Sequence, residues 1–414
     1  MRSLTLAGAL LALLSGSALA HDDTGPQDDA RALLGLIWQY YAYPERVDES
    51  RLAPFAAPAR LDAITSEYGL LQYAECVLHT LEDHHAIMGV SSAVSFGLVP
   101  SYTDLWMVHE EGHYRIADVR SGSPAAHAGI EPGLQLVALG GEAVEEAVSH
   151  LCGGPFTTDE GRGFAARVLV AGPRDRSRML TVRGDEGQTR EVELPNLYEQ
   201  GISRPDSPVS ALLLEDGVLV LRVHDSLSED GFVAAVDAAL EQAGPVGVVI
   251  DLRDTPSGGN TVNARGLLGR FVDQTRPYQR HHLTVEGRST GVERQWIEEV
   301  LPRGDTLAHV PVAVLVGRWT GSMGEGLAMG FHHAAGAKIV GAPMAGLLGA
   351  VYDFTLSHTG WTVKLPAERM SHVDGTPREA FRPSTLLESA EILPGMDSDP
   401  ALEAAVQSLR AEPR

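Results

Sequence analysis

The stretch that decides the fold reads VPVAVLVGRWTGSMGEG at residues 310–326. Its first part, 310–316, is an unbroken apolar run, which is typical of a strand buried on both faces of a parallel sheet. The glycine-rich part that follows leads into an apolar helical run at 326–335. Ser322 therefore falls between a strand and a helix. This is the edge where parallel α/β sheets place their active-site groups.

Ser322 admits two interpretations. Together with Glu325 it forms a capping box, in which a serine and a glutamate satisfy free N–H groups at a helix start. The position also suits a nucleophile, because a helix N-terminus favours negative charge and the Met323 N–H can point at an oxyanion. The two roles are compatible. Thr320 replaces the first glycine of G-x-S-x-G, which excludes an α/β-hydrolase elbow.

The surrounding sequence alternates strands and helices. This alternation implies crossover connections and parallel pairing, and it predicts an α/β domain at 211–393 followed by a C-terminal helix within 394–414. The other elements expected are strands at 218–223, 246–252 and 339–340, and helices at 232–243 and 264–272.

Two further groups follow strands of this predicted sheet. The stretch DLRDTPSGGN at 251–260 places Gly258 and Gly259 in a turn whose unshielded N–H groups can donate to an oxyanion, although the same turn can be purely structural. His224 follows the strand at 218–223, so its ring can supply the base that a serine nucleophile needs. A lone histidine is more often structural.

A glycine-rich region of short alternating segments precedes this domain at 96–196. It contains GSPAAHAGIEPGLQLVALGG at 122–141, in which Ser123 caps a short helix that Gly129 ends. This stretch resembles a PDZ domain, a fold that takes a peptide C-terminus as an added strand. We expect a PDZ-like domain here, joined to the α/β domain by a linker at 197–210.

The N-terminal part predicts export. Residues 1–20 have a basic start, an apolar run too short for a membrane span and a small-x-small end, as in a secretory signal. Residues 21–95 show helical spacing and predict a small helical domain. A periplasmic or secreted protein resides in an oxidising compartment, where Cys76 and Cys152 can form a disulfide. Two separately buried thiols are an equal alternative, because both cysteines lie in apolar helical stretches.

Composition excludes several partners and cofactors. The chain has 414 residues with 32 Lys+Arg and 55 Asp+Glu, and its net charge of −23 argues against nucleic acid or an anionic membrane surface. HEEGH at 109–113 matches a zinc-peptidase motif, but alternating patterns on both sides predict a hairpin and not a helix. We expect no metal and no other cofactor.

The pieces together resemble the tail-specific (C-terminal processing) and tricorn-type serine peptidases. The resemblance rests on 251–259, 311–325 and 340–341, and it extends over roughly 96–383. It implies an α/β catalytic domain of the crotonase/ClpP-like type with parallel strands, behind a PDZ-like domain. The roles it implies are a nucleophile at Ser322, an oxyanion hole at Met323 with Gly258 or Gly259, and an acidic residue at Glu325.

The sequence departs from the tail-specific pattern at the base. Leu347 stands where that branch has its lysine, and the chain's two lysines are Lys338 and Lys364. The tricorn-type branch implies a histidine base and a late glutamate instead. His224 and Glu379 lie in comparable regions, and His372 is a competing base.

We therefore expect an exported serine-type peptidase with a histidine base. Its substrates would be peptides or proteins, held through their C-termini at the PDZ-like domain. The alternative is a non-catalytic peptide- or ligand-binding protein on the same scaffold.

Overall fold

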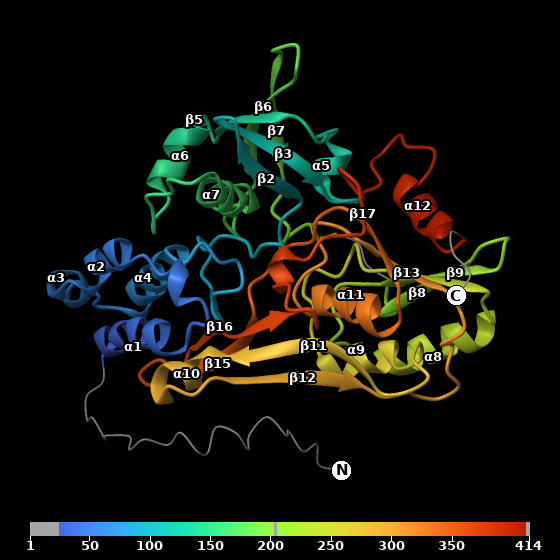
Figure 1. Cartoon of the computed structure of the whole chain (residues 1–414). Helices are drawn as coiled ribbons and strands as arrows, with labels where there is room; N and C mark the ends of the chain where they lie inside the picture. Colours follow the sequence, from blue (N-terminus) through green and yellow to red (C-terminus); the bar gives the residue numbers. More distant parts are fainter. Residues whose placement is uncertain (1–24, 203–204, 411–414) are drawn as a thin grey trace.

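The computed structural model describes residues 25–202 and 205–410. Figure 1 shows three groups of elements: helices at the N-terminal end, a small sheet with helices above them, and a larger α/β body. The predicted signal at 1–20 lies outside the described residues. Within the described part of the chain, no helix is long and apolar enough to cross a membrane.

A parallel sheet forms the centre of the body. Strands β10 (Gly247–Asp251) and β13 (Val312–Val316) are buried at every position, which confirms the buried strands expected from their apolar runs. The neighbours pair in parallel except β8 (Val209–Leu213), which pairs antiparallel with β9 (Val218–Val223). The strand order is β17 (Thr385–Leu386), β14 (Lys338–Gly341), β13 (Val312–Val316), β10 (Gly247–Asp251), β9 (Val218–Val223), β8 (Val209–Leu213).

Helices cover both faces of this sheet. The predicted helices are present as α8 (Phe232–Ala243), α9 (Thr261–Leu268) and α11 (Met323–Ala334), and their apolar side chains share one core with strand residues such as Ile250 and Val314. Helix α12 (Pro400–Ser408) packs on the opposite face. The carboxyl edge of the parallel strands stays open for the loops that follow β9, β10 and β13.

A second, antiparallel sheet lies beside this body and was not expected from the sequence. Its strands are β1 (Ile87–Met88), β16 (Thr362–Ser371), β11 (Arg276–Leu283) and β12 (Arg294–Val300), with β15 (Ala350–Thr355) paired to β16 and α10 (Thr284–Thr290) between β11 and β12.

The N-terminal helices form one core with this second sheet. Val363 and Leu365 of β16 pack among their apolar residues. The helices, joined by a 3₁₀ turn at Pro44–Arg46, are α1 (Pro26–Tyr40), α2 (Glu49–Ala56), α3 (Pro58–Asp62) and α4 (Glu67–His79). The N-terminal segment is therefore fixed against the last third of the chain.

The region above them contains a third sheet (Figure 1). The HEEGH stretch lies in the hairpin of its first two strands, with Glu110 opposite His113, as predicted. The Ala126 N–H donates to Ser123 Oγ at 3.2 Å, which is the expected cap. The elements are β2 (Leu105–Glu110), β3 (His113–Val119), β4 (Gln135–Leu139), β5 (Glu142–Ala143), β6 (Arg178–Arg183), β7 (Thr189–Leu194), α5 (Pro124–His127), α6 (Val144–His150) and α7 (Asp159–Ala171).

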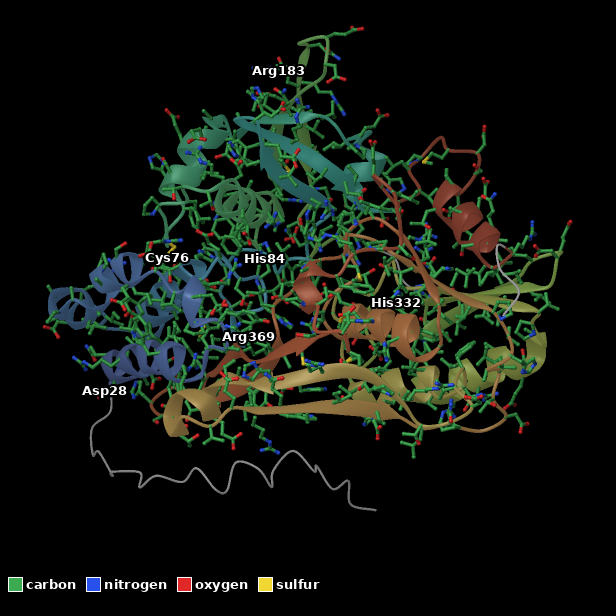
Figure 2. All side chains as sticks on the ribbon, in the orientation of Figure 1. Asp28, Cys76, His84, Arg183, His332 and Arg369 are labelled. Atoms are coloured by element: carbon green, nitrogen blue, oxygen red, sulfur yellow. A yellow bond between two sulfur atoms is a disulfide. The ribbon has the colours of Figure 1, made fainter. Side chains whose placement is uncertain are left out.

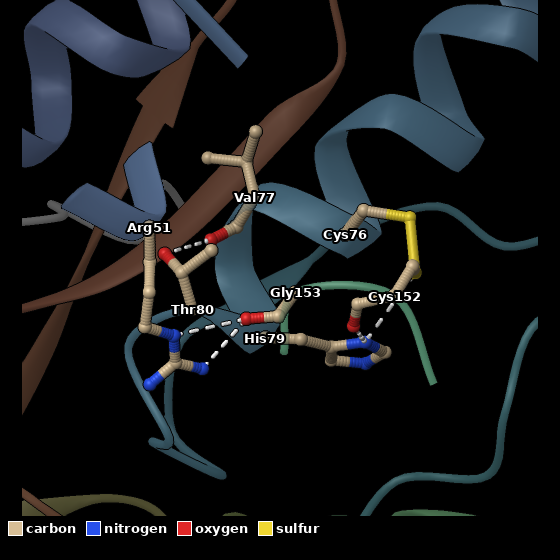
Figure 3. The surroundings of a disulfide bond; sticks show 7 residues. All are labelled: Arg51, Cys76, Val77, His79, Thr80, Cys152 and Gly153. Carbon is tan, nitrogen blue, oxygen red and sulfur yellow. Dashed lines mark hydrogen bonds between the residues drawn. A yellow bond between two sulfur atoms is a disulfide. The ribbon is translucent and has the colours of Figure 1, made fainter. Parts of the chain in front are cut away.

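Cys76 and Cys152 form a disulfide, with Cα atoms 5.0 Å apart (Figure 3). The alternative of two separate thiols is wrong, because Cys152 lies in a turn just beyond α6 and faces α4. Gly153 allows this close approach: its φ is +92°, and an added Cβ would lie 2.6 Å from His79 Cβ. Arg51 of α2 donates to the Gly153 carbonyl at 2.6 Å, which is a second contact between the N-terminal helices and this turn.

Candidate active site

Ser322 lies where β13 gives way to α11, at the N-cap of the helix. Its backbone has φ +54° and ψ −117°, an uncommon conformation for a residue with a side chain. Strained backbones of this kind cluster at functional sites. Ser322 is half-buried, so its hydroxyl lies near the surface at the carboxyl edge of the sheet.

Glu325 holds this turn in place. Its fully buried carboxylate accepts N–H bonds from Ser322 at 2.8 Å, Gly346 at 2.9 Å and Leu347 at 3.2 Å. Burial raises the pKa of Glu325 to about 7, although Arg378 and these three N–H groups act in the opposite direction. Glu325 therefore ties the serine turn to the segment at 346–347.

The double-glycine loop reaches the same serine. Gly258 has φ +62°, and an added Cβ would lie 2.5 Å from both the Met323 nitrogen and Ser322 Cβ. Gly259 faces the other way, because its added Cβ would lie 2.5 Å from Ser228 Oγ. Of the oxyanion residues expected from the sequence, the structure thus brings Met323 and Gly258 directly to Ser322.

His224 follows β9 as expected, but its ring has other partners. Its Nε2 lies 2.9 Å from Ser210 Oγ, and its Nδ1 lies 3.5 Å from Asp254 Oδ2. The strand order puts β10 between β9 and β13, which separates the two strand ends by about 10 Å. Within the described residues, no hydrogen bond joins His224 to Ser322.

Asp254 carries a fixed charge beside this ring. Burial alone would raise its pKa, but the adjacent His224 ring and the Arg120 guanidinium, which donates at 2.9 Å, hold that pKa well below the usual range. His224 is therefore placed beside a carboxylate in a Ser–His–Asp arrangement whose serine is Ser210.

His372 lies far from the serine. Its Nε2 is 3.1 Å from Nδ1 of His332, which is labelled on α11 in Figure 2, and its Nδ1 is 2.9 Å from Asp374. His332 is ten positions beyond Ser322, or about 15 Å along the helix.

The two lysines are also elsewhere. Lys364 pairs with Asp353 at 2.8 Å on the second sheet. Lys338 is exposed at the first position of β14, so it lies at the edge of the parallel sheet opposite Ser322.

Leu347 packs next to the serine turn. Its Cδ1 lies 3.2 Å from the position of a Cβ added to Gly321. Leu347 also lines a cavity of about 290 Å³, together with Glu379 and His84. Glu379 Oε2 is buried there without a hydrogen-bond partner among the described residues.

The histidine pair His84–His85 approaches this cavity from the N-terminal segment. His85 Nδ1 lies 2.6 Å from the Leu348 carbonyl, and burial lowers the pKa of His85 to about 4. This pair is not among the candidate bases expected from the sequence. Its position depends on the packing of the N-terminal helices against the second sheet, which leaves no local signal.

Comparison with known proteins begins with a family model. Residues 217–382 match the family model of peptidase family S41. The match confirms the resemblance drawn from the sequence and supports a serine-type peptidase, a hydrolase, while leaving an inactive homologue open.

Individual relatives agree with this class. The carboxy-terminal processing protease CtpA of Bacillus subtilis is 24% identical over 303 residues, which cover 70% of this chain and 57% of that protease. The chain thus spans little more than half the length of this relative.

Two solved structures have the same fold. The photosystem II D1 C-terminal processing protease matches with a TM-score of 0.54 and 17% identity, over 94% of this chain and 99% of that chain. Mature CPAF matches with a TM-score of 0.53 and 16% identity, over 93% and 95%.

Proposed function

We propose that the protein is an exported serine-type peptidase that hydrolyses peptide bonds with Ser322 as nucleophile. One observation carries the proposal: Ser322 holds an uncommon backbone conformation at a helix N-terminus, with the Gly258 loop pressed against its Cβ and against the Met323 nitrogen. A nucleophilic hydroxyl and an oxyanion donor next to it are what acyl transfer requires.

In the proposed hydrolysis each residue has a separate role. Ser322 Oγ attacks the scissile carbonyl while an imidazole removes its proton. The carbonyl oxygen becomes an oxyanion, which accepts N–H bonds from Met323 and from Gly258 or Gly259. Collapse of this intermediate expels the amine, which takes the proton from the imidazole. Water then hydrolyses the acyl-enzyme by the same steps.

The imidazole has two candidate sources. His224 acts if its ring turns away from Ser210, and Asp254 then orients it. His84 or His85 acts if the segment at 346–348 moves, and Glu379 in the same cavity then orients the ring. The lowered pKa of His85 keeps its ring neutral and able to accept a proton, but a general base is stronger when its pKa lies nearer the working pH. Glu325 positions the serine turn in either case.

The remaining regions present the substrate. In this proposal 211–393 is a crotonase/ClpP-like catalytic domain, 96–196 is a PDZ-like domain that binds the C-terminus of a peptide or protein, and 21–95 is a helical domain. The α5 cap at Ser123 supports the PDZ-like assignment. Export follows from the signal-like segment at 1–20, and the disulfide agrees with an oxidising compartment.

Loss of cleavage on Ser322→Ala tests the proposal. The purified wild-type and variant proteins are incubated with an unfolded protein and with peptides that have free C-termini, and fragments are identified by mass spectrometry. Cleavage by the wild type that disappears in the variant supports the proposal. Equal cleavage by both proteins contradicts it. His224→Gln and His85→Gln, assayed in the same way, identify the base.

A second function is favoured by one specific observation. Leu347 occupies the wall beside the serine turn, and within the described residues neither His224 nor a lysine is bonded to Ser322. A non-catalytic protein that binds peptides or small ligands on this scaffold would have these features. Peptide binding by the wild type without any cleavage distinguishes this function from the first.

A further inference from the structure

The cavity beside Leu347 contains arginines that lack carboxylate partners. Arg167 donates to His84 Nε2 at 2.9 Å and to the Met107 carbonyl at 2.9 Å. Arg382 donates only to backbone carbonyls, at 2.9 and 3.0 Å. Arg318 has a buried Nε without a hydrogen-bond partner. Among the described residues, none of these three forms an ion pair.

Most other charges of the cavity are neutralised. Arg46 pairs with Glu160 at 2.9 Å, and Glu82 pairs with Arg51 at 2.5 Å. Asp83 accepts from the Tyr41 hydroxyl at 2.9 Å, and burial raises its pKa to about 6.

One acidic group of the cavity, Glu379, has a carboxylate oxygen without a hydrogen-bond partner among the described residues. The carboxylate of Glu379 interacts with Asp83 and with Tyr43 of the N-terminal segment. The basic wall consists of Arg167 on α7, Arg318 in the loop before Ser322 and Arg382 just after Glu379. The charge of Glu160 acts on Arg167, and those of Asp118 and Glu110 act on Arg318, but within the described residues none of these carboxylates forms an ion pair with them.

Trp106 contacts two of the three arginines of the basic wall. Its ring lies 5.2 Å from the Arg167 guanidinium and 5.5 Å from that of Arg318. Trp106 also meets Trp319 edge to face at 6.2 Å. Arg318 and Trp319 belong to the loop that carries Ser322, so the wall is joined to the serine turn by a few residues of chain.

Burial of Arg167 and Arg318 without an ion-pair partner among the described residues makes this wall costly when it is empty. Burial, and then the charge of Arg318, lower the pKa of Arg167 to about 10. Burial also lowers the pKa of Arg318; the charge of Asp118 acts in the opposite direction, and Arg382 adds to the lowering. An anion between the three guanidinium groups would remove the repulsion and satisfy their free N–H donors.

We propose that Arg167, Arg318 and Arg382 bind a carboxylate of the peptide substrate, in a subsite next to Ser322. This deepens the proposed function by naming the substrate class, peptides with a C-terminal carboxylate or an acidic side chain at this subsite. A planar guanidinium matches a carboxylate with two parallel hydrogen bonds, which favours this ligand. In a chain with net charge −23, a local basic wall also attracts acidic peptides selectively.

Peptide binding to the Ser322→Ala protein tests the subsite without requiring turnover. The probes are four N-terminally fluorescein-labelled peptides of one apolar sequence: free acid, C-terminal amide, and amides with one internal Asp or Asn. Fluorescence anisotropy measures each dissociation constant. We expect the free acid or the Asp peptide to bind about tenfold more tightly than its neutral counterpart. The peptide that shows this preference identifies the source of the carboxylate.

Variants of Arg318 assign the preference to this wall. Arg318→Met keeps an apolar stem against Trp106 and should abolish the preference, whereas Arg318→Lys should retain part of it. Arg382→Met, at an exposed position, gives the same test if Arg318→Met does not fold. Arg60→Met, an equal charge change on exposed α3, should leave binding unchanged.

Two results would overturn the proposal. Equal binding of acids and amides shows that no carboxylate is recognised. A preference that survives Arg318→Met and Arg382→Met places the carboxylate elsewhere on the molecule. Because all proteins carry Ser322→Ala, neither result depends on whether Ser322 cleaves peptides.

Discussion

At the scale of single residues, Ser322 is held in an uncommon backbone conformation by the groups around it. Gly258 presses on it from the loop after β10, and Glu325 accepts its N–H from inside α11. A conformation of this kind persists only when its surroundings enforce it. Substitutions at Gly258 or Glu325 should therefore change the backbone conformation of Ser322 while its hydroxyl group is kept.

Gly258→Ala should greatly slow the reaction of the Ser322 hydroxyl with a fluorophosphonate. The added methyl group would lie 2.5 Å from the Met323 nitrogen, so the loop and the serine turn must separate. Loss of one oxyanion donor alone typically costs about 10²–10³ in rate. The rate of labelling by a fluorophosphonate, relative to wild type, measures the effect.

Gly291→Ala is the matched control. Gly291 has φ +74°, and an added Cβ would meet nothing within 4 Å. It carries a similar backbone penalty of about 1–2 kcal/mol, but far from the serine. Equal labelling losses in both variants would show that general destabilisation, and not the loop contact, is responsible.

Glu325→Gln should destabilise the protein by about 1–3 kcal/mol. An amide has one acceptor oxygen, so its NH₂ group must face at least one of the three N–H donors that the carboxylate now satisfies. Urea unfolding measures the change, with exposed Glu229→Gln as the control. A stability equal to that of the control would contradict the positioning role of Glu325.

At the scale of elements, the sequence predicts the buried parallel strands well. Runs such as Val312–Val316 are apolar throughout because both faces are covered, and this pattern needs no knowledge of distant residues. The turn at Ser322 and the cap at Ser123 are equally local, so both could be recognised from neighbouring residues.

The second sheet could not be recognised in this way. Strand β11 (Arg276–Leu283) contains arginine, glutamine and two histidines, and it buries polar groups that only distant residues satisfy. His281, for example, contacts Glu368 of β16 and, at 3.1 Å, Glu298 of β12. The contact that brings His85, a candidate base, toward the serine turn has no local signal either, because His85 and Leu348 are 263 positions apart.

The disulfide should stabilise the contact between α4 and the turn after α6. It closes a loop of 76 residues, for which restriction of the unfolded chain predicts about 4.5 kcal/mol. The double variant Cys76→Ser, Cys152→Ser should therefore unfold at a lower urea concentration. A reductant should lower the midpoint of the wild type and leave that of the double variant unchanged. A double variant that unfolds at the same urea concentration as the wild type would contradict this account.

At the scale of the whole molecule, two buried carboxyl groups lie where β3 meets the segment before α12. Asp118 accepts from Ser389 at 2.7 Å, and Glu391 accepts from the Ser121 N–H at 2.7 Å. Each keeps a buried oxygen without a hydrogen-bond partner among the described residues. Burial, and then the charge of Glu391, raise the pKa of Asp118 to about 7.

This contact should weaken as pH rises. The folded protein keeps a proton on Asp118 that the unfolded chain, with a pKa near 3.8, gives up. The contribution to stability is therefore complete below pH 3.8 and is lost as pH rises through about 7. Asp118→Asn should remove this dependence and make the protein more stable than wild type at about pH 8.

Urea unfolding at about pH 5.5 and about pH 8 measures this difference. Asp185→Asn, in the exposed turn between β6 and β7, is the control, and its stability should follow the wild type at both values. A wild type and an Asp118→Asn variant that respond identically to pH would contradict the assignment.

The central claim is that Ser322 is an activated nucleophile. Incubation of the folded protein with a fluorophosphonate probe near neutral pH, followed by peptide mass spectrometry, tests it most directly. We expect one adduct, on the peptide that contains Ser322, and no adduct on Ser322→Ala. A folded wild-type protein that takes up no probe, or a label that persists in Ser322→Ala, would contradict the account and favour the ligand-binding alternative.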